Sequence, residues 1–148
     1  MSLKEKLKTE LKNALKAKDK IRLETIRAII NAVKNQEINS KKELDNNEIE
    51  KIIATLVKQR KDSIEQFKKG GRDDLVAKEQ QELNILLEFL PEQLTEQEIV
   101  TIVKQAISEL GNVSQKDLGK VMQKVMPKLQ NRADGKLVNQ IVRKLLSK

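Results

Sequence analysis

Apolar residues recur at helical spacing along nearly the whole chain, and no stretch alternates between apolar and polar residues as a strand does. The first such segment covers residues 2–17. Ser2 is its predicted N-cap, and Glu5, three residues further on, completes a capping box. The apolar side of this segment carries Leu3, Leu7, Leu11, Ala14 and Leu15. The pattern therefore predicts an all-α fold.

Three further amphipathic segments follow in the first two thirds of the chain, at residues 20–36, 46–69 and 73–90. A polar stretch at residues 39–47 is expected to form a loop. Gly70 and the glycine after it end the third segment, as glycine often does past a helix C-terminus. Pro91 disfavours helical geometry at the residue before it. These signals predict a four-helix N-terminal domain over residues 1–92.

The remaining residues, 93–148, contain the signals of three shorter helices. Thr95 and Ser114 are the predicted N-caps of the first two, and Asp134 is the predicted cap of the last. Pro127 lies within the second helix and is expected to kink or end it, because proline has no N–H to donate. We expect a small three-helix C-terminal domain, which at this length is marginally stable alone.

Charged residues occupy several positions where the helical pattern predicts an apolar face. Arg60 shares a face with apolar residues of the third helix, and Glu79 and Glu82 do so in the fourth. Arg27 is similarly placed in the second helix. We predict half-buried ion pairs such as Arg60 with Glu79 or Glu82, which fix helix register and add little net stability. A pocket for an anionic or polar ligand is the alternative interpretation. A carboxylate metal site is not predicted, since the chain has no histidine.

Lysines recur every four residues in the C-terminal part, at Lys116, Lys120, Lys124 and Lys128. At about 100° per residue, this spacing places them along one stripe of a helix. The residues predicted for the opposite, apolar face are Leu118, Val121, Met122, Val125 and Leu129. The stripe is either a solvated helix face or a surface for an anionic partner.

The excess of positive charge is concentrated in the same region. The whole chain carries 30 Lys and Arg against 22 Asp and Glu, a net charge of +8. From Ser114 onward, nine basic residues face two acidic ones. Such a concentration favours an anionic partner. Phe67 and Phe89 are the only aromatic residues, so any nucleic-acid contact is expected with phosphates and shape, not by base stacking.

The composition argues against catalysis and against a membrane location. Without histidine or cysteine, the chain has no Ser-His-Asp triad and no thiolate chemistry. It also lacks a glycine-rich phosphate loop. We therefore predict no catalytic residue and no cofactor. No apolar stretch is long enough for a membrane span, and the first residues do not resemble a signal peptide. The expected location is cytoplasmic.

Two runs of the sequence resemble the YqeY family. They are RKDSIEQFKKGGRDDLVAKEQQELNILLEFLPEQL and LGKVMQKVMPKLQNRADGKLVNQIVRKLL. The resemblance covers nearly the whole chain and implies an all-helical fold of four helices followed by three. This family shares its domain with the tail of the B subunit of aspartyl/glutamyl-tRNA amidotransferase (GatB), and that tail is implied to contact tRNA. The resemblance places this role on Lys120, Lys124, Arg132 and Lys136, and the stripe adds Lys116 and Lys128.

The residues and the resemblance together give three hypotheses for function. The first is a non-catalytic tRNA-binding accessory module that acts beside a tRNA synthetase or an amidotransferase component. The second is a helical protein–protein adaptor without RNA binding, in which Met122 and Met126 contact the partner. The third is an amidotransferase with its own activity, since a family-level label would be carbon–nitrogen ligase with glutamine as amide donor. We expect no such activity, because the chain lacks the glutaminase triad and the cradle that activates the tRNA-bound carboxylate.

Overall fold

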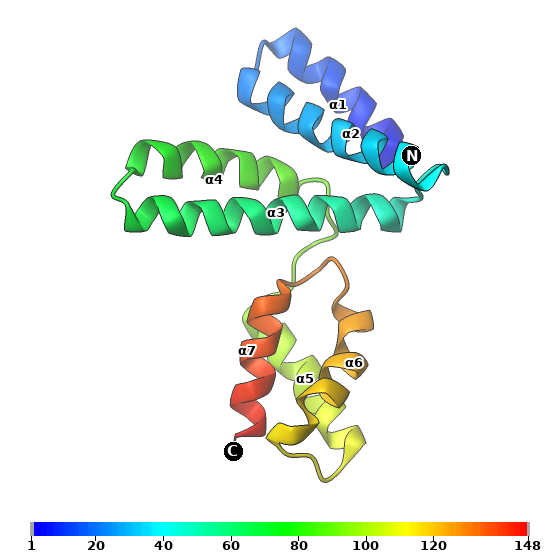
Figure 1. Cartoon of the computed structure of the whole chain (residues 1–148), viewed down its shortest axis with the longest axis vertical. Coiled ribbons are helices and arrows are strands. Elements are labelled where there is room, and N and C mark those ends of the chain that lie inside the picture. The colour runs from blue at the N-terminus through cyan, green and yellow to red at the C-terminus, as the bar shows by residue number, and fades with distance from the viewer. Residues whose placement is uncertain (1, 148) are drawn as a thin grey trace. The chain divides into compact units, whose positions relative to one another are not determined.

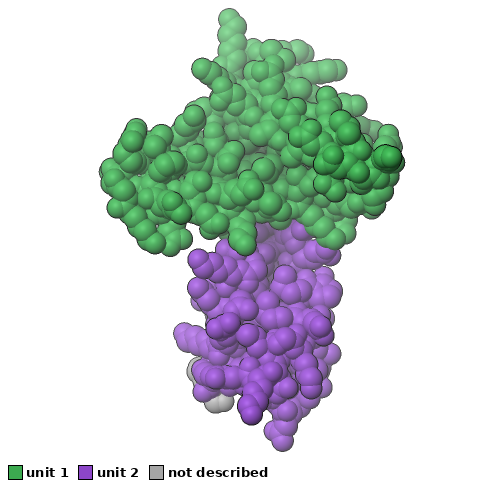
Figure 2. Space-filling view, in the orientation of Figure 1, with its two compact units in different colours: residues 1–90 green, residues 91–148 purple. Residues whose placement is uncertain are grey.

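The chain is described by a computed structural model that covers residues 2–147, and every regular element in that range is helical (Figure 1). The predicted all-α fold is confirmed. The helices are α1 (Leu3–Ala17), α2 (Lys20–Ser40), α3 (Asn46–Lys69), α4 (Asp73–Leu87), α5 (Glu96–Leu110), α6 (Leu118–Leu129) and α7 (Gly135–Leu146), with a 3₁₀ turn, η1 (Gln115–Asp117), before α6. The chain divides into two compact units, residues 1–90 and 91–148 (Figure 2).

The first unit is built from two helical hairpins, α1 with α2 and α3 with α4 (Figure 1). Its core joins residues from all four helices, because each helix turns one apolar side inward. Fully buried side chains of this core include Ile26, Ile29, Ile49, Ile53 and Leu86. The α3–α4 turn uses Gly71, whose φ of 70° lies in the left-handed region that glycine adopts without strain.

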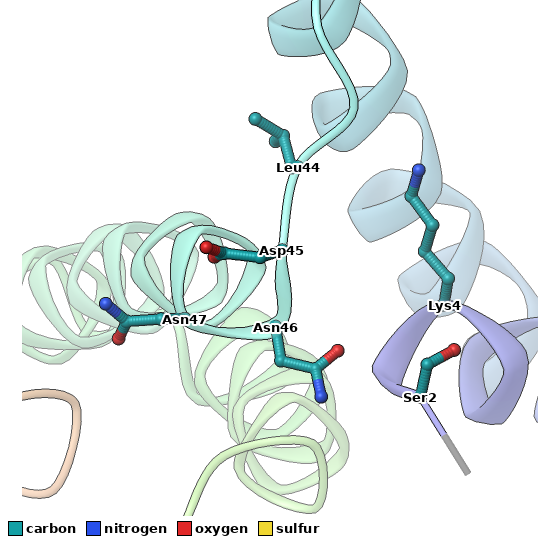
Figure 3. A pocket seen from close by; sticks show the side chains of 6 residues that line it. All are labelled: Ser2, Lys4, Leu44, Asp45, Asn46 and Asn47. Carbon is teal, nitrogen blue, oxygen red and sulfur yellow. The ribbon is translucent and has the colours of Figure 1, made fainter.

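The starts of α1 and α3 are fixed by side-chain caps and by one bond between them. Ser2 Oγ accepts a hydrogen bond from the Glu5 N–H at 3.2 Å, and the Glu5 carboxylate bonds back, as predicted. Asp45 caps α3 in the same way. The Asn46 side chain points toward the start of α1 (Figure 3), where its Oδ1 accepts from the Leu3 N–H at 3.0 Å. This bond joins two segments that lie far apart in the sequence.

Two helix ends differ from the sequence prediction. α2 continues to Ser40, so the predicted loop at residues 39–47 is shorter. Polar residues suggested a loop there, but an exposed helical segment is also polar. α4 ends at Leu87 instead of residue 90, because the next three N–H groups bond to carbonyls three residues back. The tighter turn that results places Phe89 in the core.

Arg60 lies between the two carboxylates that the sequence analysis named. Its Nε is 2.9 Å from Glu82 Oε2 and 3.4 Å from Glu79 Oε2, so one cation on α3 faces two anions on α4. Its side chain is 25% exposed, and both glutamates are less exposed. Neither Arg60 Nε nor Glu79 Oε2 is in a well-aligned hydrogen bond within residues 2–147. The cluster is therefore held by charge more than by directed hydrogen bonds.

The predicted ion-pair role of Arg27 is wrong, and Arg22 takes it instead. Arg27 is exposed, and no ion pair of the described residues includes it. It lies about 100° around α2 from the buried Ile26, whereas Arg22 shares the buried face. Arg22 bonds to Glu10 of α1 and to Glu88 after α4, each at 2.9 Å. The bond to Glu88, then that to Glu10, raises the pKa of Arg22.

The second unit consists of α5, α6 and α7, each packed against the other two. Its core is separate from that of the first unit and includes Ile99, Val103, Val121, Val125, Leu129, Val138 and Val142. Thr95 caps α5 with a capping box to Glu98, and Asp134 caps α7, both as predicted. Pro127 lies inside α6, and the helix ends shortly after it, at Leu129.

Candidate nucleic-acid interface

The predicted lysine stripe is divided between two elements. Lys120, Lys124 and Lys128 lie on α6, but Lys116 lies in η1. The reason is the capping box of Ser114 with Asp117, which closes a 3₁₀ turn and delays the start of α6 to Leu118. Lys116 is exposed and precedes the stripe without sharing its helical register.

The three α6 lysines have different environments, because a spacing of four residues rotates each side chain by about 40° around the helix. Lys120 points to solvent with a side chain 73% exposed, and its Nζ is 3.7 Å from Asp117 Oδ1. Lys124 is 33% exposed and lies at the flank that meets α5. Lys120 is therefore the more accessible of these two cations.

Lys124 has an internal partner on α5. Its Nζ lies 2.9 Å from Glu109 Oε2, and Gln105 Nε2 donates to the other Glu109 oxygen at 3.2 Å. The bond from Lys124, then that from Gln105, lowers the pKa of Glu109, and the charge of Lys128 adds to the effect. A phosphate that binds Lys124 must compete with this carboxylate.

Arg132 lies in the turn between α6 and α7 and contacts the segment before α5. Its Nε donates to the Glu92 carbonyl at 3.4 Å, and its own carbonyl accepts from the Leu94 N–H at 2.8 Å. Gln93 Nε2 donates to the Asn131 carbonyl in the same turn at 2.9 Å. Arg132 is half-buried, so its contacts hold the turn in place in addition to supplying a charge.

The first turn of α7 presents Lys136 to solvent. Asp134 of the RADG sequence accepts from the Lys136 N–H at 3.1 Å, so this carboxylate serves as the helix cap. The Lys136 side chain is exposed on the side of α7 that faces away from Val138 and Val142. It belongs to another helix than the α6 lysines.

Two further exposed cations, Arg143 and Lys144, lie at the end of α7 and were not predicted as site residues. A cavity of about 350 Å³, lined by Gln115, Leu118, Arg143 and Leu146, brings the end of α7 next to the start of α6. The signal that could have identified Arg143 is its spacing of seven residues from Lys136, which places both on one side of α7. The exposed cations of α7 therefore add to those of η1 and α6, and together they form the basic surface of the second unit.

Several of these cations are not engaged by carboxylates. Within residues 2–147, no ion pair involves Lys116, Lys128, Lys136, Arg143 or Lys144. Ammonium and guanidinium groups bind phosphate oxygens through charge-assisted hydrogen bonds. In the same range, no group of three or more acidic side chains is arranged to hold a metal ion. These five basic side chains are therefore available to bind an anionic group.

The model of the YqeY-like protein family matches residues 4–146. The chain belongs to the YqeY family. The resemblance carried by the two sequence runs is thereby confirmed, over nearly the full length of the chain. Family membership agrees with the all-helical fold of the described residues.

Curated relatives of this YqeY family member include yeast proteins named "Altered inheritance of mitochondria protein 41, mitochondrial". The protein of Kluyveromyces lactis is 49% identical over 81 residues, which is 54% of this chain and 44% of the yeast protein. That of Lachancea thermotolerans is 40% identical over 107 residues, 70% of this chain and 57% of the yeast protein. The chain thus spans about half the length of the curated relatives it matches.

Two observations bear on the location of the chain. Within residues 2–147, no helix combines the length and the apolar character that crossing a membrane requires. The yeast relatives carry the word mitochondrial in their names. The cytoplasmic location expected from the sequence therefore stays a prediction.

Proposed function

We propose that the chain is a tRNA-binding accessory module whose second unit, residues 91–148, contacts the RNA. The observation that carries the proposal is the group of exposed, uncompensated cations on η1, α6 and α7. The sequence resemblance supports it, because the motif that resembles the amidotransferase tail, LGKVMQKVM and RADGKLV, includes residues of this surface. We also propose that the two helical units act as separate domains and that the second domain consists of three helices.

The proposed contact is with the phosphate backbone and the shape of the RNA. No aromatic residue occurs in the second unit, so bases have no ring to stack on. Lys120, Lys128 and Lys136 would neutralise phosphates directly, whereas Lys124 would first leave Glu109. Binding by such a surface is sensitive to salt and only weakly dependent on base sequence.

The proposed role is binding without catalysis. Amide transfer from glutamine requires a nucleophile with a base and an activated acyl group, and the sequence supplies neither histidine nor cysteine for the first. We propose that any carbon–nitrogen ligase label belongs to the larger enzyme that shares the domain. The partners we propose are tRNA and a tRNA synthetase or amidotransferase component. Incubating the purified chain with glutamine, ATP and Glu-tRNA or Asp-tRNA should give no amidated product.

The test is equilibrium binding of uncharged tRNA to the full chain as the salt concentration is varied. If about four phosphates are neutralised, the logarithm of the affinity should fall against the logarithm of salt with a slope near −3 to −4. A double-stranded DNA of similar length serves as a shape control and should bind more weakly. Absence of saturable tRNA binding at about 50 mM salt would reject the proposal.

A second candidate function is a helical adaptor that binds another protein without RNA. Met122 and Met126, which the sequence analysis assigned to this role, pack against the core of the second unit. The observation that favours an adaptor lies instead in the first unit, where an apolar groove between α1 and α2 is bordered by lysines. Stoichiometric recovery of one protein after nuclease treatment, together with no tRNA binding, would favour the adaptor over the tRNA module.

A further inference from the structure

The turn between α6 and α7 lies beside the segment that leads into α5, residues 91–94 (Figure 1). One side chain of this segment bonds to the turn. Gln93 Nε2 donates to the Asn131 carbonyl of the turn at 2.9 Å and to the Pro91 carbonyl of its own segment at 3.0 Å. Gln93 therefore ties the turn to the start of the second unit.

The segment that carries Gln93 is itself fixed to the second unit. Leu94 packs against the apolar core of this unit, so the segment cannot leave the turn without exposing that side chain to water. The Leu94 N–H donates to the Arg132 carbonyl at 2.8 Å, and Arg132 Nε donates to the Glu92 carbonyl at 3.4 Å. Bonds therefore run in both directions between this segment and Arg132.

The backbone of the turn has a conformation that benefits from such support. Asn131 has a φ of 62°, in the left-handed region that residues other than glycine seldom adopt. The next N–H, that of Arg132, bonds to the Leu129 carbonyl at 2.9 Å. The carbonyl that Gln93 binds belongs to the peptide group that joins Asn131 to Arg132. The orientation of Arg132 therefore depends on the bond from Gln93.

Arg132 differs in this respect from the lysines of the basic surface. Lys120 has a side chain 73% exposed, and a lysine ammonium is a point charge on a flexible stem. Arg132 is half-buried and bonded through its Nε, and a guanidinium is a planar fork that binds two phosphate oxygens in a fixed geometry. Lysines can follow almost any arrangement of phosphates, whereas a fixed fork binds best when the phosphate approaches in one orientation.

We propose that Arg132 selects folded RNA over flexible polyanions and that Gln93 is the positioning residue that makes this selection possible. This inference rests on the proposed tRNA-binding function. Gln93 holds the Arg132 guanidinium in the orientation that meets a phosphate of a folded backbone, where neighbouring phosphates have fixed positions. A flexible polyanion gains nothing from this preorganisation, because it can adapt to the lysines alone. The second unit thus reads the shape of its partner as well as its charge.

The test compares the binding of uncharged tRNA and of inorganic polyphosphate to the full chain at one salt concentration. Gln93→Met keeps the length of the side chain and removes its donor, and Gln97→Met makes the same change at an exposed position on α5 as the control. Gln93→Met should lose about fivefold in tRNA affinity and stay within about twofold of the wild type for polyphosphate. Equal losses for both probes, no loss for tRNA, or an equal loss in the control would overturn the proposal.

A double-mutant cycle tests whether Gln93 acts through Arg132. Arg132→Lys keeps the positive charge and removes the planar fork, so it should show the same selective loss of tRNA affinity. In the Arg132→Lys background, Gln93→Met should cost about 1.5-fold at most, because no fork is left to position. Losses that multiply in the double variant would overturn the proposal. If Gln93→Met fails to fold, the selective loss in Arg132→Lys is still required.

The outcome for the wild type separates this inference from the tRNA proposal. Absence of saturable tRNA binding by the wild type would reject both. Normal tRNA binding by the wild type and equal binding by Gln93→Met would reject only the positioning role of Gln93. Amide hydrogen exchange reports on the support itself, since the Leu94 N–H bonds to the Arg132 carbonyl. This amide should exchange faster in Gln93→Met than in Gln97→Met, and equal rates would contradict the proposed hold on the turn.

Discussion

Lys124 on α6 is bonded to Glu109 on α5, with 2.9 Å between Nζ and Oε2. The pair joins two helices of the second unit and engages one of the residues that the family resemblance assigns to tRNA contact. Both side chains remain partly exposed, so the pair itself contributes little to stability. Its main consequence is competition, since the carboxylate and an RNA phosphate would both bind the same ammonium group.

Replacing Glu109 should therefore strengthen tRNA binding. Glu109→Gln removes the competing carboxylate and releases Lys124, and we expect the affinity for tRNA to rise about threefold at about 100 mM salt. Glu96→Gln on the first turn of α5 makes the same change in net charge at an exposed position and is the control. An equal increase in both variants would mean that only net charge matters and that Lys124 has no particular role.

The titration of Glu109 reports on the same pair. Because hydrogen bonds from Lys124 and Gln105 lower the pKa of Glu109, NMR titration should place it below the value of about 4.3 found for free glutamate. Lys124→Gln should raise this pKa toward the ordinary value. An unchanged pKa in the variant would contradict the contact.

The sign of the pH effect on stability follows from the direction of that shift. A carboxylate with a lowered pKa in the folded state stabilises the fold above its unfolded-state pKa, and this stabilisation is lost as the pH falls through the folded-state pKa. Denaturant unfolding at about pH 6 and about pH 3 should therefore show a smaller loss on acidification for Lys124→Gln than for the wild type. An equal loss would indicate that the pair does not persist in solution.

The Arg60 cluster should behave as a register-fixing ion pair. Arg60→Met leaves Glu79 and Glu82 facing each other with little solvent, and we expect the free energy of unfolding to fall by about 1–3 kcal/mol. Adding Glu79→Gln and Glu82→Leu should restore most of it, because no unpaired charge is left. Urea unfolding measures both values. A triple variant less stable than Arg60→Met would contradict this interpretation.

The cap of α5 should stabilise the second unit locally. Thr95→Ala removes the side chain that accepts from the Glu98 N–H at 3.2 Å, at a cost of about 1 kcal/mol. Thr101→Ala on the exposed surface of the same helix is the control and should be close to neutral. Amide hydrogen exchange should accelerate in α5–α7 for Thr95→Ala only. Faster exchange in both variants would show that the capping bond is unimportant.

The helices and several of their caps could be predicted from the sequence because they depend on local signals. The Ser2–Glu5 and Thr95–Glu98 boxes need residues only three positions apart. The ends of α2 and α4 could not be predicted as well. The end of α2 depends on whether a polar segment stays helical, and the end of α4 depends on the tight turn that places Phe89 in the core.

The candidate site could be predicted only in part, since its electrostatics depend on tertiary contacts. The positions of the lysines on α6 followed from their spacing, but the pairing of Lys124 with Glu109 requires α5 to lie beside α6. Lys116 lies outside the lysine stripe because Ser114 caps a 3₁₀ turn at this point. The spacing of the lysines does not distinguish a 3₁₀ turn from an α-helix. Arg27 was assigned to the buried face of α2, although it lies about 100° around the helix from the buried Ile26, and Arg22, which lies nearer that face, was not named.

The most direct test of the central claim is tRNA binding by a charge-reversal variant of the second unit. Lys120→Glu with Lys128→Glu changes two exposed cations on α6, and Lys12→Glu with Lys16→Glu makes the same changes, at exposed positions, on α1. Affinities are measured for both variants over a salt series. We predict that the α6 variant loses about tenfold or more in affinity at about 100 mM salt and that its salt slope falls by about 2, while the α1 variant stays within about twofold of the wild type. Equal affinities for the two variants would contradict the assignment of tRNA binding to the second unit.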